Sequence, residues 1–205
     1  MPAIMAMSVY AAAFSPAVVL FTTVVSRRPE RIVLMFLSAF VWLVSISLSA
    51  ALWVGVAPLQ SSIPWLLLPA TLLQEAGRYV MYVAYVRLLC WLREAGLQPR
   101  DAGPISAQLP GAAVANGVGI WSVYTLVLYG DVLWRARLPG SLYTPMCSYA
   151  STFFVDAVCA CGIGSVNVLL SLIGWTTAYP RRSPALVSGM VGLHLLASAA
   201  TALNS

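Results

Sequence analysis

The sequence predicts an all-α integral membrane protein: a polytopic bundle of six transmembrane helices with an extracytoplasmic N-terminus. Three observations predict this class. Hydrophobic residues occupy 60% of the 205 positions and charged residues only 8%, whereas charged residues make up roughly a quarter of soluble domains. The mean hydropathy is +0.87. Apolar runs of the roughly 20 residues that a transmembrane helix needs account for more than half of the chain.

Six apolar runs are long enough to serve as spans. They lie near residues 5–25, 32–54, 63–87, 111–133, 149–175 and 185–203. Segments rich in Pro, Gly, Ser or Arg separate them, at 26–31, 58–64, 93–110, 139–140 and 180–184. Because these connections are short, we expect one transmembrane domain over residues 1–205.

The arginines predict the orientation of the spans. The chain has eleven basic residues against six acidic ones, a net charge of +5, and every basic residue is Arg. With the N-terminus outside, eight arginines fall in the inner loops: Arg27, Arg28, Arg31, Arg87, Arg93, Arg100, Arg181 and Arg182. Only Arg135 and Arg137 then fall outside. The positive-inside rule favours this orientation, so the basic excess reports topology and predicts no nucleic-acid partner.

The cysteines do not indicate a metal site, and the N-terminus does not indicate a cleaved signal peptide. The four cysteines include no C-x-x-C pair and no Cys/His cluster with zinc spacing, so we expect neither a metal site nor another cofactor. Residues 1–8 contain no Lys or Arg, although a cleaved signal peptide needs a basic n-region. We therefore expect the first run to be a retained helix.

The third span carries the polar residues Gln74, Glu75 and Arg78. Ionisable residues are costly inside a bilayer, so each is a functional candidate. Glu75 and Arg78 stand at i, i+3 and can neutralise each other on one helix face, which predicts a polar core that docks this helix. In the alternative interpretation Glu75 is a base that activates water, which requires a partner such as histidine.

Two further spans carry ionisable residues. Asp156 lies in the fifth span and His194 in the sixth, while Asp131 lies at the outer end of the fourth. An Asp and a His on adjacent helices can hydrogen-bond or relay protons. The spacing in the sequence does not determine whether these side chains meet.

A strip of small residues opens the fourth span. Gly111, Ala115 and Gly119 recur every four residues and so lie on one helix face. Small residues at this spacing let another helix backbone approach closely. We predict that this small-residue strip serves helix packing or assembly.

Several segments, in order along the chain, resemble one family. They are residues 14–21, 39–45, 74–78, 111–119 and 192–196. The most specific is the Gln-Glu-x-x-Arg pattern at 74–78, and the small-residue strip falls on a Gly-xxx-Gly-xxx-Gly helix. Together these segments resemble the anterior-pharynx-defective (Aph) family, the scaffold subunit of γ-secretase.

The resemblance implies a non-catalytic role. The family's subunit joins nicastrin, then presenilin and the small presenilin-enhancer subunit, and it stabilises an intramembrane aspartyl protease that cleaves Notch-like and amyloid-precursor-like stubs. It implies membranes of the endoplasmic reticulum, Golgi, plasma membrane and endosomes, and lipid contact. It also implies that His194, with Asn167, makes a polar contact that supports presenilin.

Three departures from the family pattern stand out. The middle glycine of the strip is Ala115, which is still small. The family's second intramembrane histidine is replaced by Val168, with Asn167 adjacent. The family has seven spans with a cytoplasmic C-terminus, whereas six spans place Ser205 outside, where the family's seventh span would begin.

Two other classes of protein compete with a scaffold. A glutamate-dependent intramembrane protease of the prenyl-protein-processing type would use Glu75 and His194, but its signature is a Glu-Glu pair and this chain has Gln74 before Glu75. Gln cannot accept a proton as a general base. A transporter would show inverted repeats or broken helices, and we find neither in the sequence.

Overall fold

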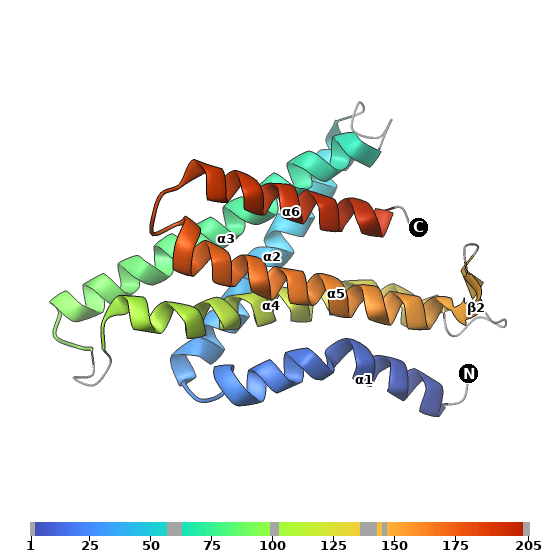
Figure 1. The fold of residues 1–205 in the computed structure, drawn as a ribbon, viewed down its shortest axis with the longest axis horizontal. Helices are drawn as coiled ribbons and strands as arrows, with labels where there is room; N and C mark the ends of the chain where they lie inside the picture. The colour runs from blue at the N-terminus through green and yellow to red at the C-terminus, as the bar shows by residue number, and fades with distance from the viewer. Residues whose placement is uncertain (1–2, 57–62, 99–102, 136–142, 145–146, 203–205) are drawn as a thin grey trace.

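Six long helices make up most of the described structure (Figure 1). The computed structural model describes residues 3–56, 63–98, 103–135, 143–144 and 147–202. The helices are α1 (Ala3–Leu20), α2 (Pro29–Gly55), α3 (Ile63–Glu94), α4 (Ile105–Arg135), α5 (Thr152–Ile173) and α6 (Pro184–Ala202). Each coincides with one predicted span, so the six-helix architecture is confirmed. Single π-helical turns, η1 (Phe21–Val25) and η3 (Gly174–Ala178), continue α1 and α5.

A short hairpin corrects the purely α-helical prediction. Strands β1 (Tyr143–Thr144) and β2 (Cys147–Ser151) pair antiparallel before α5. The predicted fifth span began at residue 149, but the strand continues to Ser151 and the helix begins at Thr152. The segment is rich in Ser, Thr and Tyr, and the Thr and Tyr residues favour a pleated strand.

The helices α3 and α4 extend beyond the predicted spans. The helix α3 continues to Glu94, so Arg87 and Arg93 lie on its last turns and not in a loop, which corrects the loop assignment. Arg93 stands where cations complement the helix dipole, and Gly96 follows with a φ of +68°, a conformation that ends helices. The helix α4 begins six residues before the predicted span, at Ile105, and accommodates Pro110 near its start.

The core of the bundle surrounds α4. This helix packs most extensively against α5 and α2, while α3 packs against α2 and α6. Figure 1 shows α4 and α5 side by side along the middle of the molecule, with α2 and α3 crossing them obliquely. Trp121 of α4 is almost fully buried, and Gly164 of α5 lies directly against its indole ring. The close packing therefore depends on glycines opposite large side chains.

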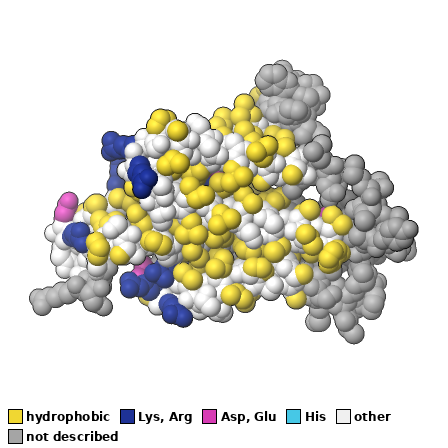
Figure 2. All heavy atoms as spheres, viewed as in Figure 1, with side chains coloured by type: hydrophobic (Ala, Val, Ile, Leu, Met, Phe, Trp, Pro, Cys, Tyr) yellow, Lys and Arg dark blue, Asp and Glu magenta, His cyan; other side chains and the backbone are white. Residues whose placement is uncertain are grey.

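The outside of the bundle is largely apolar. Exposed side chains on α2 include Phe36 and Phe40, which are 65% and 64% exposed. Within the described residues, two segments are long and apolar enough to cross a membrane by length and composition, Pro29–Gly55 and Phe154–Ala178. Figure 2 shows yellow apolar side chains over much of the visible face, with the arginines gathered toward one end.

Candidate functional site

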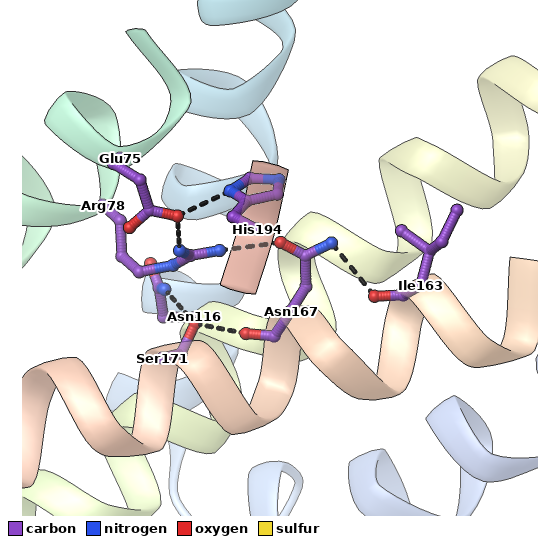
Figure 3. Close-up of polar contacts among 7 residues, drawn as sticks. All are labelled: Glu75, Arg78, Asn116, Ile163, Asn167, Ser171 and His194. Carbon is purple, nitrogen blue, oxygen red and sulfur yellow. Dashed lines mark hydrogen bonds and ion pairs between the residues drawn. The ribbon is translucent and has the colours of Figure 1, made fainter. Parts of the chain in front are cut away.

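Four polar side chains from three helices meet inside the bundle (Figure 3). Glu75 and Arg78 come from α3, Asn167 from α5 and His194 from α6. Their exposed fractions are 8%, 1%, 1% and 4%. We call these four residues the polar centre. They are separated by up to 119 positions in the sequence, so only the packing of the helices brings them together.

The carboxylate of Glu75 joins two of the helices. Its Oε1 atom accepts a hydrogen bond from Nη1 of Arg78, one turn further along α3. The same oxygen lies 2.7 Å from Nδ1 of His194 on α6. A buried carboxylate needs such partners because removing a charge from water without compensation is costly.

The guanidinium of Arg78 extends the network to α5. Its Nη2 donates to Oδ1 of Asn167 at 2.7 Å, and Nδ2 of Asn167 donates to the carbonyl of Ile163 at 3.1 Å. This second bond orients the amide so that its oxygen faces the arginine. The polar centre therefore cross-links α3, α5 and α6.

A second pair of polar residues links the same region to α4. Oγ of Ser171 donates to the carbonyl of Asn167 at 2.9 Å, and Nδ2 of Asn116 donates to Ser171 Oγ at 2.9 Å. Asn116 and Ser171 are buried. These two hydrogen bonds therefore also connect the helix turn that carries Asn167 to α4.

Trp42 of α2 lies over the polar centre. Its ring stacks on His194 with centroids 6.1 Å apart and an interplanar angle of 9°. Cζ of Arg78 lies 5.8 Å from the centroid of the same ring, a cation–π distance. Trp42 is 2% exposed, so it limits access to the carboxylate from the α2 side.

The sequence predicted part of this site. It grouped Glu75 and Arg78, which are paired in the structure, but it also included Gln74. Gln74 is half-buried and takes no part in the described network. Successive helix residues point about 100° apart, so a neighbour of Glu75 cannot share its direction. Gln74 therefore points away from the contacts of Glu75, and its part in a polar core stays a prediction.

Asn167 and Val168 take different directions from α5. Asn167 points into the polar centre, whereas Val168 packs against α4. A Cβ built on Gly117 would lie 2.6 Å from Cα of Val168, so the two helix backbones are nearly in contact there. The amide of Asn167, and not the side chain of Val168, occupies the polar centre in this chain.

The residues of the small-residue strip have different neighbours within the chain. A Cβ on Gly119 would lie 2.3 Å from the carbonyl oxygen of Met35, which is backbone of α2. Ala115 is fully buried. Gly111 instead faces the guanidinium of Arg31, whose Nη1 donates to the carbonyl of Val24 at 2.9 Å. Gly119 thus permits close helix approach, while Gly111 leaves room for a side chain.

Asp156 lies apart from the polar centre. Asp156 stands 11 residues before Asn167 on α5, which is about 16 Å along a helix at 1.5 Å per residue. The side chain of Asp131 lies outside the part of the chain that the structure describes. The candidate pairing of an aspartate with His194 is replaced by the contact between Glu75 and His194.

Sequence analysis missed Trp42, Asn116 and Ser171 as contributors to the site. Asn116 had a detectable signal, because an amide within a long apolar helix is costly unless it has partners. Ser171 had none, since serine is an ordinary residue of apolar helices. Trp42 lies in the segment 39–45 that resembles the family, but that resemblance does not indicate a contact with Arg78 or His194. Among the described residues, no three His, Cys, Asp or Glu side chains group as metal ligands.

The sequence of this chain matches one protein family along nearly its whole length. The family model described as Aph-1 protein matches residues 4–205. A gamma-secretase subunit APH1-like protein of Arabidopsis thaliana is 26% identical over 170 residues, which cover 80% of this chain and 67% of that protein. Gamma-secretase subunit aph-1 of Caenorhabditis elegans is 38% identical over 81 residues, covering 39% of this chain and 25% of that protein.

A third relative is gamma-secretase subunit Aph-1b of Danio rerio, 32% identical over 118 residues that cover 52% of this chain and 43% of that protein. The aligned part of the chain spans about two thirds of the length of the plant relative and less than half of the other two. The family match extends over nearly the whole chain and confirms the resemblance of its motifs. This protein belongs to the Aph-1 family.

Proposed function

We propose that this protein is a membrane-embedded, non-catalytic scaffold subunit of a γ-secretase-like intramembrane aspartyl protease complex. The observation that carries the proposal is the polar centre, where a carboxylate is held between an arginine and a histidine from two helices. Such an arrangement holds helices together. The relatives are named as gamma-secretase subunits, and these names supply the kind of complex.

The membrane location is supported by the outer surface of the bundle. Two segments meet the length and composition of membrane spans, and large apolar side chains are exposed on the helices. The connections at 26–31 and 180–184, which carry arginines, lie toward the same end of the bundle (Figure 1), as the positive-inside rule requires. We propose that this end is cytoplasmic and that the N-terminus is extracytoplasmic.

The non-catalytic role is supported by the geometry of Glu75. One oxygen of its carboxylate already receives Arg78 and His194, and the residue is 8% exposed. A general base must reach the proton that it abstracts, either directly or through water. Gln74, which would stand for the second glutamate of a protease signature, takes no part in the network. We therefore assign the proteolytic chemistry to a partner subunit.

The proposed partners are presenilin, nicastrin and the small presenilin-enhancer subunit, and the substrates are Notch-like and amyloid-precursor-like stubs. His194 and Asn167 are 4% and 1% exposed, which favours an indirect role: they support presenilin by fixing the relative positions of α3, α5 and α6. We propose that the complex resides in the endoplasmic reticulum, Golgi, plasma membrane and endosomes.

One observation favours a second function, a glutamate-dependent intramembrane protease. Glu75 and His194 lie 2.7 Å apart, which is the distance expected of a base and its partner. In that case Arg78 would stabilise the carboxylate, and water would need a path past Trp42. This alternative predicts activity from the isolated protein.

Affinity purification of the tagged protein in a mild detergent distinguishes the two functions. The scaffold proposal expects co-purified presenilin-like and nicastrin-like chains, with proteolysis abolished when the presenilin aspartates are substituted. Glu75→Gln should leave the specific activity per assembled complex intact, and Gln74→Ala serves as the matched control outside the polar centre. An isolated protein that cleaves a prenylated peptide, and loses activity with Glu75→Gln, would overturn the scaffold proposal.

A further inference from the structure

A groove lies between α2 and α3, away from the polar centre. Its volume is about 650 Å³, within the range of small-molecule sites. The walls are apolar side chains of the two helices, among them Val33 and Leu37 of α2 and Ala84 and Leu88 of α3. Val33, Leu37 and Leu88 are more than half exposed, so the groove opens to the side of the bundle.

Polar groups line the same groove. Arg28 and Glu30, at the start of α2, form an ion pair at 3.6 Å, and their side chains are 47% and 50% exposed. Gln98, four residues past the end of α3, also lines the groove. Its Nε2 atom is buried and has no hydrogen-bond partner among the residues that the structure describes. A buried donor without a partner is uncommon in folded proteins and indicates that a ligand or water completes the site.

We infer that this groove binds one zwitterionic glycerophospholipid, of the phosphatidylethanolamine or phosphatidylcholine type. The acyl chains lie along the apolar walls, the phosphate accepts hydrogen bonds from Arg28 and from Nε2 of Gln98, and the ammonium group lies at Glu30. The inference rests on the proposed membrane location. It adds a specific lipid site to a bundle that is otherwise in general contact with lipid.

The distribution of polarity selects this occupant. A phospholipid has one polar headgroup and long apolar acyl chains. The groove has the same distribution, with apolar walls and polar groups at the start of α2 and after the end of α3. That rim includes the first arginine-bearing connection, which the topology places at the membrane surface. It carries a cation and an anion together, and this complements a zwitterionic headgroup better than an anionic one.

The first test fills the groove with a bulky side chain. Ala84→Trp places an indole in the groove, and Ala50→Trp makes the same change at an exposed position of α2 outside it. The full-length protein, purified with its co-expressed partners, is analysed by native mass spectrometry and lipid extraction. We expect about tenfold less retained phospholipid with Ala84→Trp, and no change with Ala50→Trp. Equal retention by the two variants would overturn the inference.

The second test addresses the headgroup. Protein in nanodiscs containing equal amounts of dioleoyl phosphatidylethanolamine and dioleoyl phosphatidylglycerol is re-extracted, and the retained lipid is identified. We expect phosphatidylethanolamine on the unaltered protein, a shift toward phosphatidylglycerol with Glu30→Gln, and loss of both with Arg28→Gln. Arg27→Gln, outside the groove lining, is the control. Retention of phosphatidylglycerol by the unaltered protein, or a copurifying polypeptide crosslinked into the groove, would contradict the inference.

Failure of this inference is distinguishable from failure of the proposed function. A protein that fractionates with membranes and assembles with its partners, yet retains no phospholipid, overturns the lipid site alone. A protein recovered without membranes overturns both. Normal assembly of Ala84→Trp without bound lipid would support the lipid site and show that the scaffold role does not depend on it.

Discussion

The polar centre and the small-residue strip both join helices of this bundle, but they depend on different properties of their residues. At Gly119 the α4 backbone lies against the carbonyl of Met35, and the contact is possible only because no side chain intervenes. At the polar centre, charged and amide groups of side chains connect the helices. The strip therefore depends on shape and the polar centre on charge balance.

This difference predicts how each region fails. A substitution in the polar centre leaves a buried charge without its partner, and a second substitution that removes that charge can restore part of the loss. A larger residue at the closest contact of the strip forces two backbones apart, and no change of charge can compensate.

Arg78→Met should have the largest effect. It removes the cation beside Glu75 and leaves a buried carboxylate, so we expect a loss of about 3–5 kcal/mol in the free energy of unfolding. Denaturation in mixed micelles measures it. The double substitution Glu75→Gln with Arg78→Met should recover part of the stability because neither charge remains. A double variant whose loss is the sum of the two single losses would contradict charge balance as the cause.

Gly119→Leu should separate α4 from α2. Even a Cβ would lie 2.3 Å from the carbonyl oxygen of Met35, so the backbone must shift. Overpacking of this kind costs about 1–3 kcal/mol, and we expect reduced recovery of the assembled complex. Gly189→Leu on α6 is the matched control, because no atom lies within 4 Å of a Cβ there. Equal recovery of the two variants would count against a packing role for Gly119.

Asn167→Ala should have an intermediate effect. It removes the acceptor for Nη2 of Arg78 and leaves a buried donor unpaired, which costs about 1–3 kcal/mol. Val168→Ala, at the adjacent position, alters packing against Gly117 without touching the polar centre. A double-mutant cycle of Asn167→Ala with Arg78→Met should show coupling. Additive losses would show that the 2.7 Å contact contributes little.

Gly111→Ala should have the smallest effect of these substitutions in the small-residue strip and the polar centre. The new methyl group meets the guanidinium of Arg31, the far end of a flexible side chain that can rotate away. The expected loss is that of the bond from Arg31 to the Val24 carbonyl, about 0.5–1.5 kcal/mol. In the background Arg31→Ala, the same glycine substitution should cost nothing. A loss as large as that of Gly119→Leu would mean that Gly111 also contacts backbone.

Much of the fold could be predicted from the composition and from the Pro, Gly and Arg residues that separate the apolar runs. All six predicted spans are helices because long apolar runs bounded by Pro, Gly and Arg permit few other structures. Helix ends were less predictable: α3 continues past Arg87 and Arg93, since arginines near a helix C-terminus are compatible with the helix. The hairpin at 143–151 was missed because two short strands have no clear periodicity of their own.

The candidate site was predictable only where its residues are close in sequence. Glu75 and Arg78 are three positions apart, and helix geometry places them on one face. Asn167 and His194 were singled out by resemblance and by polarity, but their contacts with Arg78 and Glu75 span 89 and 119 positions. No rule for neighbouring residues predicts contacts between positions so far apart in the sequence. Nothing in the sequence indicated that Trp42 lies over the polar centre.

The sequence alone determined the six helices, the paired charges of α3 and the membership of the chain in one family. These properties depend on composition and on contacts within a helix turn. The tertiary structure decided which residues meet across helices: Asn167 rather than Val168 at the polar centre, Gly119 against backbone and Gly111 against Arg31. Each outcome depends on how a helix is rotated about its axis, and that rotation is set by packing against all of its neighbours.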